Sequence, residues 1–184
     1  TTKYEATPNP NKQTVSYGET PNAETSVNQI NLPEGTSYAW KTTPVTTDGP
    51  GEKDGVVEVT YKDGSKDIVN VKVTVKELSS EYEVTGAPIE VNQNNPVTND
   101  NLKAKVTATS KIGNVNGTDK ISTVVPNSPI STANYGEQIV TATVTFKDGT
   151  TKEVTIPLKV KDVTKPTIQT PTNGQNWDLI AVEG

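Results

Sequence analysis

The sequence predicts an all-β protein built from two tandem modules. Three features point to this fold: a β-branched composition, an internal repeat, and a hairpin motif in each copy of the repeat. The 184 residues include 23 Val and 30 Thr, but only 5 Leu and 1 Phe. β-Branched side chains are stiff in helices and fit the pleated surface of a sheet. Because only 30% of the residues are hydrophobic, we expect the core of each module to be thin.

The repeat relates two stretches that lie 85 residues apart. Residues 59–65 (VTYKDGS) recur as residues 144–150 (VTFKDGT), and the alternating Val of residues 69–75 align with Val154, Ile156, Leu158 and Val160. Near the start of the two copies, matching residues lie fewer than 85 positions apart. The second copy therefore carries extra residues in its middle. The predicted modules are residues 1–77 and residues 78–161.

In the first module, a short helix is predicted before the first clear strand. Thr20 followed by Pro21 is a helix-start signal, since a capping hydroxyl precedes a residue already fixed at helical φ. Ala23, Val27 and Ile30 then share one helical face, which predicts a helix over residues 21–28. A strand follows at residues 37–40 (SYAW). A single Trp in a Val-rich module is more typical of a core anchor than of a sugar-binding platform.

Each module is predicted to close with a hairpin whose turn can be deduced from the phase of the Val residues. A two-residue loop at Asp63 and Gly64 would put most of the Val row on the wrong face of the sheet. A three-residue loop instead places Val57 opposite Val69, and in the second copy it places Ala142 opposite Val154 and Val140 opposite Ile156. We therefore expect a type I turn with a glycine bulge in both modules, with Gly64 and Gly149 at positive φ.

The middle of the second module is harder to interpret. Pro96 and residues 99–106 occupy the position of the helix with a weaker pattern than in the first copy. Residues 111–118 (KIGNVNGT) predict a loop rich in Gly and Asn that holds the extra residues.

Composition excludes most catalytic and nucleic-acid-binding chemistry. The chain has no His, Cys, Met or Arg, which removes the Ser-His-Asp and Cys-His nucleophiles, ordinary zinc sites and bidentate phosphate clamps. The net charge of -5 disfavours nucleic acids and anionic membrane surfaces. No apolar run reaches membrane-spanning length and no signal segment opens the chain, so we expect a mature fragment. We also expect no cofactor.

The order of these motifs resembles the Rib/alpha-like repeat of Gram-positive, cell-wall-anchored surface proteins. The residues that carry the resemblance are 17–24 (YGETPNAE), 32–36 (LPEGT), Trp40, Gly51 and 59–65. The second module resembles the longer variant of that repeat, although it lacks the Leu-Pro-Glu-Gly string and a Trp. The resemblance implies a compact immunoglobulin-like β-sandwich in which short helical turns replace some strands. It also implies an extracellular location on the bacterial surface.

Residues 162–184 are expected to form a linker and the start of a further module. Residues 162–168 (DVTKPTI) resemble the entry strand of other Ig-like or cadherin-like modules of such surface proteins. Pro166 and Pro171 disfavour a central strand. Residues 175–184, with Trp177, are interpreted either as the beginning of a truncated domain or as a segment that docks on the second module.

Few residues are candidates for a chemical site. Asn99, Asp100 and Asn101 are rich in oxygen and could hold a cation, and a buried Lys beside an Asn and an acid could form an isopeptide crosslink. Asp63 and Asp148 are interpreted as turn residues. We therefore commit to no catalytic, cofactor-binding or metal-binding residue.

Three functions remain after these exclusions. The preferred one is a non-enzymatic stalk whose modules contact each other and hold a distal binding region away from the cell wall. The alternative is an adhesin that itself binds a host protein or glycan, with Tyr38, Trp40 and Trp177 as the aromatic platforms. An enzyme using paired carboxylates has no supporting motif.

Overall fold

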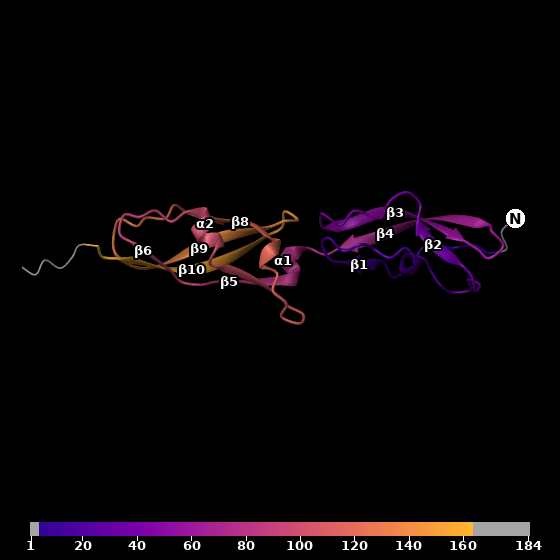
Figure 1. Ribbon diagram of the computed structural model, residues 1–184, viewed down its shortest axis with the longest axis horizontal. Coiled ribbons are helices and arrows are strands. Elements are labelled where there is room, and N and C mark those ends of the chain that lie inside the picture. The colour runs from indigo at the N-terminus through magenta and orange to yellow at the C-terminus, as the bar shows by residue number, and fades with distance from the viewer. Residues whose placement is uncertain (1–3, 164–184) are drawn as a thin grey trace, which may run out of the picture.

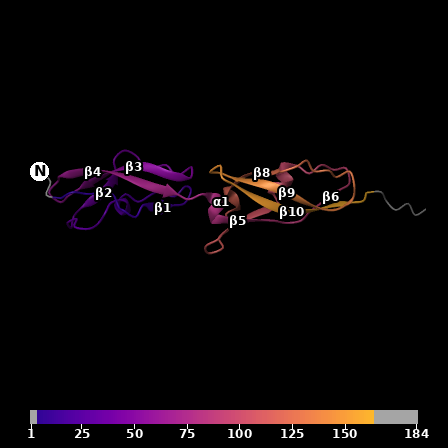
Figure 2. The ribbon, with the colours of Figure 1, turned by 180° about the vertical axis from the view of Figure 1, so that it is seen from behind.

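The computed structural model describes residues 4–163 and places two modules end to end along the long axis of the molecule (Figure 1). We call residues 4–77 module 1 and residues 78–163 module 2. The view from behind shows the same arrangement, with α1 (Leu78–Glu81) where the modules meet (Figure 2). The protein is all-β, with immunoglobulin-like modules and short helices, as the sequence predicted. None of the helices in the described part of the chain has the length and apolar character needed to cross a membrane.

Module 1 has one four-stranded sheet. Its strands are β1 (Gln13–Val15), β2 (Ser37–Trp40), β3 (Gly51–Thr60) and β4 (Lys66–Val75), in the order β1-β4-β3-β2. The short strand β1 runs parallel to β4, whereas the other pairs are antiparallel. The alternating Val of β4 face inward because side chains in a strand point to opposite faces in turn.

The hairpin predictions are confirmed in both modules. Val57 lies opposite Val69, and in module 2 the two predicted cross-strand pairs form in the same way. Gly64 and Gly149 have φ values of 89° and 86°. The Gly64 amide donates to the Tyr61 carbonyl at 2.9 Å and the Tyr61 amide donates to the Ser65 carbonyl at 2.8 Å, which closes the bulged turn.

The helix prediction for residues 21–28 is wrong in extent and in its cap. Only one 3-10 turn forms, η1 (Glu24–Ser26), and Val27 is already extended with φ −108° and ψ 142°. The side-chain oxygen of Asn22, not Thr20, accepts from the Glu24 amide at 2.8 Å. Val27 is fully buried, but Ile30 is 72% exposed because no helical face connects the two residues.

Module 2 has a fuller second layer than module 1. Its main sheet runs β6-β10-β9-β8, and β5 and β7 form a separate two-stranded sheet. The bounds are β5 (Tyr82–Gly86), β6 (Ile89–Asn92), α2 (Asn99–Lys103), β7 (Val106–Ser110), η2 (Thr118–Lys120), β8 (Ile121–Pro126), β9 (Gly136–Phe146) and β10 (Thr151–Lys161). Strand β6 pairs in parallel with β10, as β1 does with β4.

The weak helical pattern of module 2 gives the more regular helix of the two modules. Thr98 caps α2, because its hydroxyl accepts from the Asn101 amide at 3.1 Å while the Asn101 side chain accepts from the Thr98 amide at 3.0 Å. This reciprocal capping box satisfies two amides that would otherwise lack partners. The helix then buries Leu102 completely.

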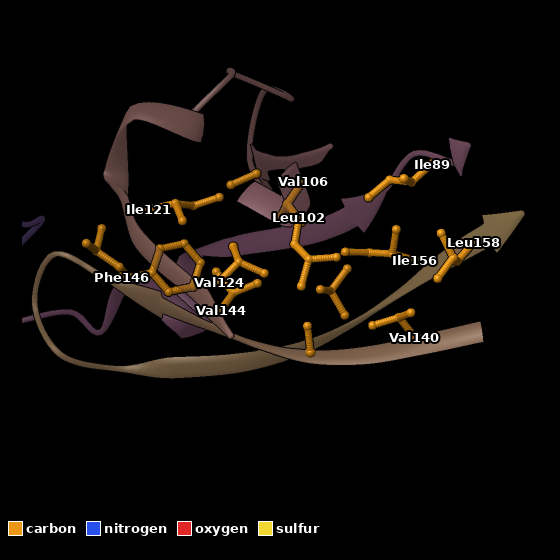
Figure 3. Packing of buried hydrophobic residues seen from close by; sticks show 14 of the residues in the cluster. Ile89, Leu102, Val106, Ile121, Val124, Val140, Val144, Phe146, Ile156 and Leu158 are labelled. Atoms are coloured by element: carbon orange, nitrogen blue, oxygen red, sulfur yellow. The ribbon is translucent and has the colours of Figure 1, made fainter. Parts of the chain in front are cut away.

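The two cores differ in composition. In module 2, fifteen buried residues form one cluster that includes Leu, Ile and Phe side chains. Figure 3 shows Phe146 beside Val144 and Val124, with Leu102 reaching in from α2 toward Ile156. In module 1 the buried hydrophobic core residues form clusters of six and three, and all of them are Val except Tyr61.

Candidate functional site

The aromatic candidates of module 1 are part of its packing. Trp40 is half-buried, contacts both Val clusters, and donates its indole N–H to the Pro21 carbonyl at 3.0 Å. A Cβ added at Gly55 would lie 2.8 Å from Cζ3 of Trp40, so the ring lies directly on the backbone of β3. These contacts agree with the core-anchor interpretation.

Tyr38 is also engaged, and Trp177 lies outside the described residues. The Tyr38 hydroxyl donates to Oε1 of Gln29 at 2.9 Å. Partial burial, and then the charge of Glu24, raise the pKa of Tyr38. The fixed hydroxyl and half-buried ring leave little of Tyr38 available for stacking on a sugar.

The oxygen-rich segment at residues 99–101 forms the start of α2. The Asn101 side chain closes the capping box. Asp100 lies in the first turn, where its negative charge interacts favourably with the positive end of the helix dipole. Within residues 4–163, no group of three acidic side chains is arranged to hold a metal ion.

The crosslink hypothesis finds no suitable triad in the described chain. An isopeptide bond requires a Lys buried beside an Asn and an acid, but every Lys of residues 4–163 is exposed or half-buried. The Lys ion pairs lie at the surface, as between Lys66 and Glu58 at 3.1 Å.

Asp63 and Asp148 stabilise the two hairpin turns. Oδ1 of Asp63 accepts from the Ser65 amide at 2.9 Å, and Oδ1 of Asp148 accepts from the Thr150 amide at 3.0 Å. The second carboxylate oxygen of Asp148 accepts from the Leu78 amide at 2.8 Å and thereby holds the start of α1. The Ser79 amide donates to the Thr150 hydroxyl at 3.1 Å. These bonds fix α1 to the hairpin of module 2.

The joint between the modules brings together side chains from both of them. Strand β4 ends at Val75 and α1 begins at Leu78, so only Lys76 and Glu77 link the modules. The Ser16 hydroxyl, at the end of β1, donates to Oε2 of Glu81 in α1 at 2.9 Å. Nζ of Lys76 lies 3.8 Å from the same oxygen. A hydrogen bond and an ion pair therefore converge on Glu81 across the joint.

Tyr17 provides the apolar part of this contact. It belongs to a turn at residues 16–19, in which the Glu19 amide donates to the Ser16 carbonyl at 3.0 Å and Gly18 has φ 79°. The Tyr17 side chain packs against the core cluster of module 2. Module 1 thus contributes one aromatic ring to the core of its neighbour.

Sequence reasoning missed the joint because its partners lie far apart along the chain. Ser16 and Glu81 are 65 positions apart, and neither belongs to a motif that indicates a hydrogen bond between them. No sequence signal indicated Tyr17, because its position beside the module boundary follows only from the pairing of β1 with β4.

Comparisons with known proteins identify both modules. The family model described as the Rib domain matches residues 3–77 and residues 79–162. The C protein alpha-antigen of Streptococcus agalactiae is 36% identical over 135 residues, which cover 70% of this chain and 12% of that protein. The chain thus spans about an eighth of this relative.

A solved structure of similar sequence covers one module. The Rib R28N structure from Streptococcus pyogenes is 40% identical, covers 41% of this chain and 95% of that chain, and has a TM-score of 0.38.

Proposed function

The chain belongs to the Rib domain family of bacterial surface-protein repeats, and on that premise we propose that it is a non-enzymatic stalk segment. In this role the two modules hold a distal binding region away from a cell wall to which the parent protein is anchored. The observation that carries the proposal is the joint, which has a two-residue linker and contacts from both modules. A short linker with such contacts favours a fixed angle between modules.

Because the modules are arranged end to end, each one adds length to the stalk without requiring a new fold. Module 1 buries its own Val clusters and module 2 buries a separate cluster, so both have a core of their own. The outer face of module 1 carries Lys side chains beside Glu and Asp, which suit a surface that faces water along its length.

Small-angle X-ray scattering of the chain tests this role. A stalk segment gives an elongated particle with a narrow distribution of maximum dimension. A broad ensemble of compact and extended shapes would contradict the proposal, because freely jointed modules hold nothing at a defined distance.

An adhesive role is the second candidate, and one difference between the modules favours it. Ile139 in β9 lies opposite Pro157 in β10, and Ile139 is 65% exposed. The corresponding pair in module 1 is Asp54 and Lys72, which form an ion pair. A hollow of about 420 Å³ lies beside the apolar pair and is lined by residues that include Ile89 and Leu158.

If module 2 binds a host protein, this apolar pair is its contact surface. The double variant Ile139→Asp, Pro157→Lys introduces into module 2 the residue pair found in module 1 and should keep the fold. Beads coated with the wild-type chain should adhere to host cells more strongly than beads coated with the double variant. Equal adherence would remove this candidate.

A further inference from the structure

We infer that the joint is a matched pair of surfaces, in which the turn at residues 16–19 of module 1 recognises α1 of module 2. This pairing determines which kind of module can follow module 1 as a rigid neighbour. The inference concerns the joint alone and does not depend on a stalk function or on a cellular location.

Module 2 contains the same turn at its own far end. Strand pairing aligns Val15 with Val91, since they lie opposite Val75 and Val160 at the ends of β4 and β10. After Val91, the Asn95 amide donates to the Asn92 carbonyl at 3.1 Å, as the Glu19 amide does to the Ser16 carbonyl at 3.0 Å.

The backbone match extends through the rest of the turn. Asn94 has φ 67° where Gly18 has φ 79°. The Asn94 amide donates to the carbonyl of Thr132, and the Gly18 amide donates to the carbonyl of Thr47. Both threonines are buried at the same point of the loop before the long hairpin. The two turns are therefore one structural element with different side chains.

Those side chains differ at the two positions that make the joint. Asn92 stands in place of Ser16, and Gln93 stands in place of Tyr17. The Gln93 side chain donates to the Ala133 carbonyl at 2.7 Å, so it bonds to its own module. Tyr17 instead packs against the core of the next module. The far end of module 2 consequently lacks the ring and the hydroxyl that hold α1.

The α1 side of the joint depends on those two groups. The Glu81 side chain is 19% exposed, and its Oε1 is buried with no hydrogen-bond partner. Oε2 relies on the Ser16 hydroxyl and the more distant Lys76. Without the Ser16 hydroxyl, this largely buried carboxylate keeps only Lys76, 3.8 Å away, so an end that lacks Ser16 holds α1 less favourably.

The partner that fits the end of module 1 is therefore of a defined kind. It is a β-sandwich module that opens, directly after a Lys-Glu linker, with a helical turn of sequence Leu-x-x-Glu. Leu78 enters the core of that module and Glu81 faces back across the joint. The end of module 2 would hold such a module only loosely, so the order of the modules is encoded in the turn.

Residual dipolar couplings of the isotopically labelled full chain test the inference. In the wild type, amides of β3 and β4 and amides of β9 and β10 should fit a single alignment tensor. The double variant Ser16→Asn, Tyr17→Gln gives module 1 the side chains of the far end of module 2. In this double variant the two modules should fit two different alignment tensors. The amide spectrum of each module should be retained, because the same turn already accommodates Asn and Gln in module 2.

Two controls and a second variant keep the test decisive. Tyr135→Ala removes a 64% exposed tyrosine at the far end of module 2 and should keep the single tensor. Glu81→Ala should give two tensors, whereas Glu83→Ala, at a 61% exposed position two residues further on, should give one. The inference is overturned if the double variant and Glu81→Ala both keep a single tensor, or if the wild type already shows two.

Discussion

Module 1 and module 2 share one hairpin design but complete their cores in different ways. Both modules have the same register in the long hairpin, the bulged turn, and a short strand that pairs in parallel with the last strand. Module 1 fills its interior with Val and the Trp40 ring, and its second layer is a single 3-10 turn with extended segments. Module 2 adds β5, β7 and α2 and a core with Leu, Ile and Phe. The long hairpin thus specifies the fold, whereas the second layer is free to vary.

This difference predicts that module 2 is the more stable unit. Larger apolar side chains remove more apolar surface from water, at about 25 cal/mol per Å². Module 2 also keeps its buried residues in one cluster.

Phe146→Ala should destabilise module 2 most strongly. The ring is 1% exposed and packs beside Tyr82, with ring centroids 6.3 Å apart. Loss of a buried Phe costs about 3–5 kcal/mol of unfolding free energy. Urea denaturation followed by amide resonances should show the midpoint of module 2 falling below that of module 1. Ile139→Ala, in the same strand at an exposed site, is the control; a similar shift in both variants would contradict the core assignment.

Tyr61→Phe tests the equivalent position in module 1. The Tyr61 hydroxyl donates to Oδ2 of Asp67 at 2.7 Å, and module 2 has Phe at this position. Hydrogen bonds to charged groups contribute about 1.5–3 kcal/mol, so module 1 should lose stability while module 2 is unchanged. An unchanged midpoint for module 1 would show that the Asp67 bond contributes nothing.

The same residue predicts a dependence on alkaline pH that is confined to module 1. Burial, followed by the hydrogen bond and charge of Asp67, raises the pKa of Tyr61 above its ordinary value of 10.0. Above about pH 10 the unfolded chain loses this proton while the folded module retains it, so stability falls as pH rises. Tyr61→Phe should flatten the decline without abolishing it, since the pKa of Tyr38 is also raised. Urea midpoints at pH 8 and pH 11 measure the slope.

Helix capping should matter less and to a similar degree in the two modules. Thr98→Ala removes the hydroxyl that caps α2, and Asn22→Ala removes the oxygen that accepts from the Glu24 amide at the start of η1. Each should cost about 0.5–2 kcal/mol in its own module. Calcium should alter neither result; a loss in Thr98→Ala that appears only with calcium would instead indicate a cation site at residues 99–101.

The smallest effect is expected at the outer face of module 1. Lys72 pairs with Asp54 and Glu52 in full contact with solvent. Exposed ion pairs of this kind contribute little because water and salt screen them. Lys72→Ala should therefore leave the midpoint of module 1 unchanged in low salt and in high salt, and a clear loss would mean that this face is more ordered than its exposure indicates.

The sequence predicted the hairpins correctly because two constraints agreed at each of them. The alternation of Val fixed the face of each strand, and the Asp-Gly pair fixed a bulged turn. The helix prediction near Pro21 was wrong because three apolar residues can match a helical period by chance. The Thr98 capping box was present in the sequence, but its closing residue is Asn101 rather than the more usual Glu or Gln.

The joint could not be predicted in the same way. Ser16 and Tyr17 contact module 2, and the position of module 2 depends on the direction in which β1 and β4 run at the end of module 1. Local patterns report how a segment folds, but they do not report which of its side chains will meet another module.

The parallel pairing of β1 with β4 determines how module 1 responds to stretching. In module 1 the entering strand β1 and the departing strand β4 lie side by side and point the same way, so a pull on the two ends slides one past the other. The ladder hydrogen bonds then share the tension and must break together, not one after another as in an unzipping hairpin. In module 2 the parallel strand β6 comes after β5, which pairs with β7 and takes the pull first. A pulling experiment on single molecules should show module 1 rupturing in one abrupt step, at a force set by the unfolding rate.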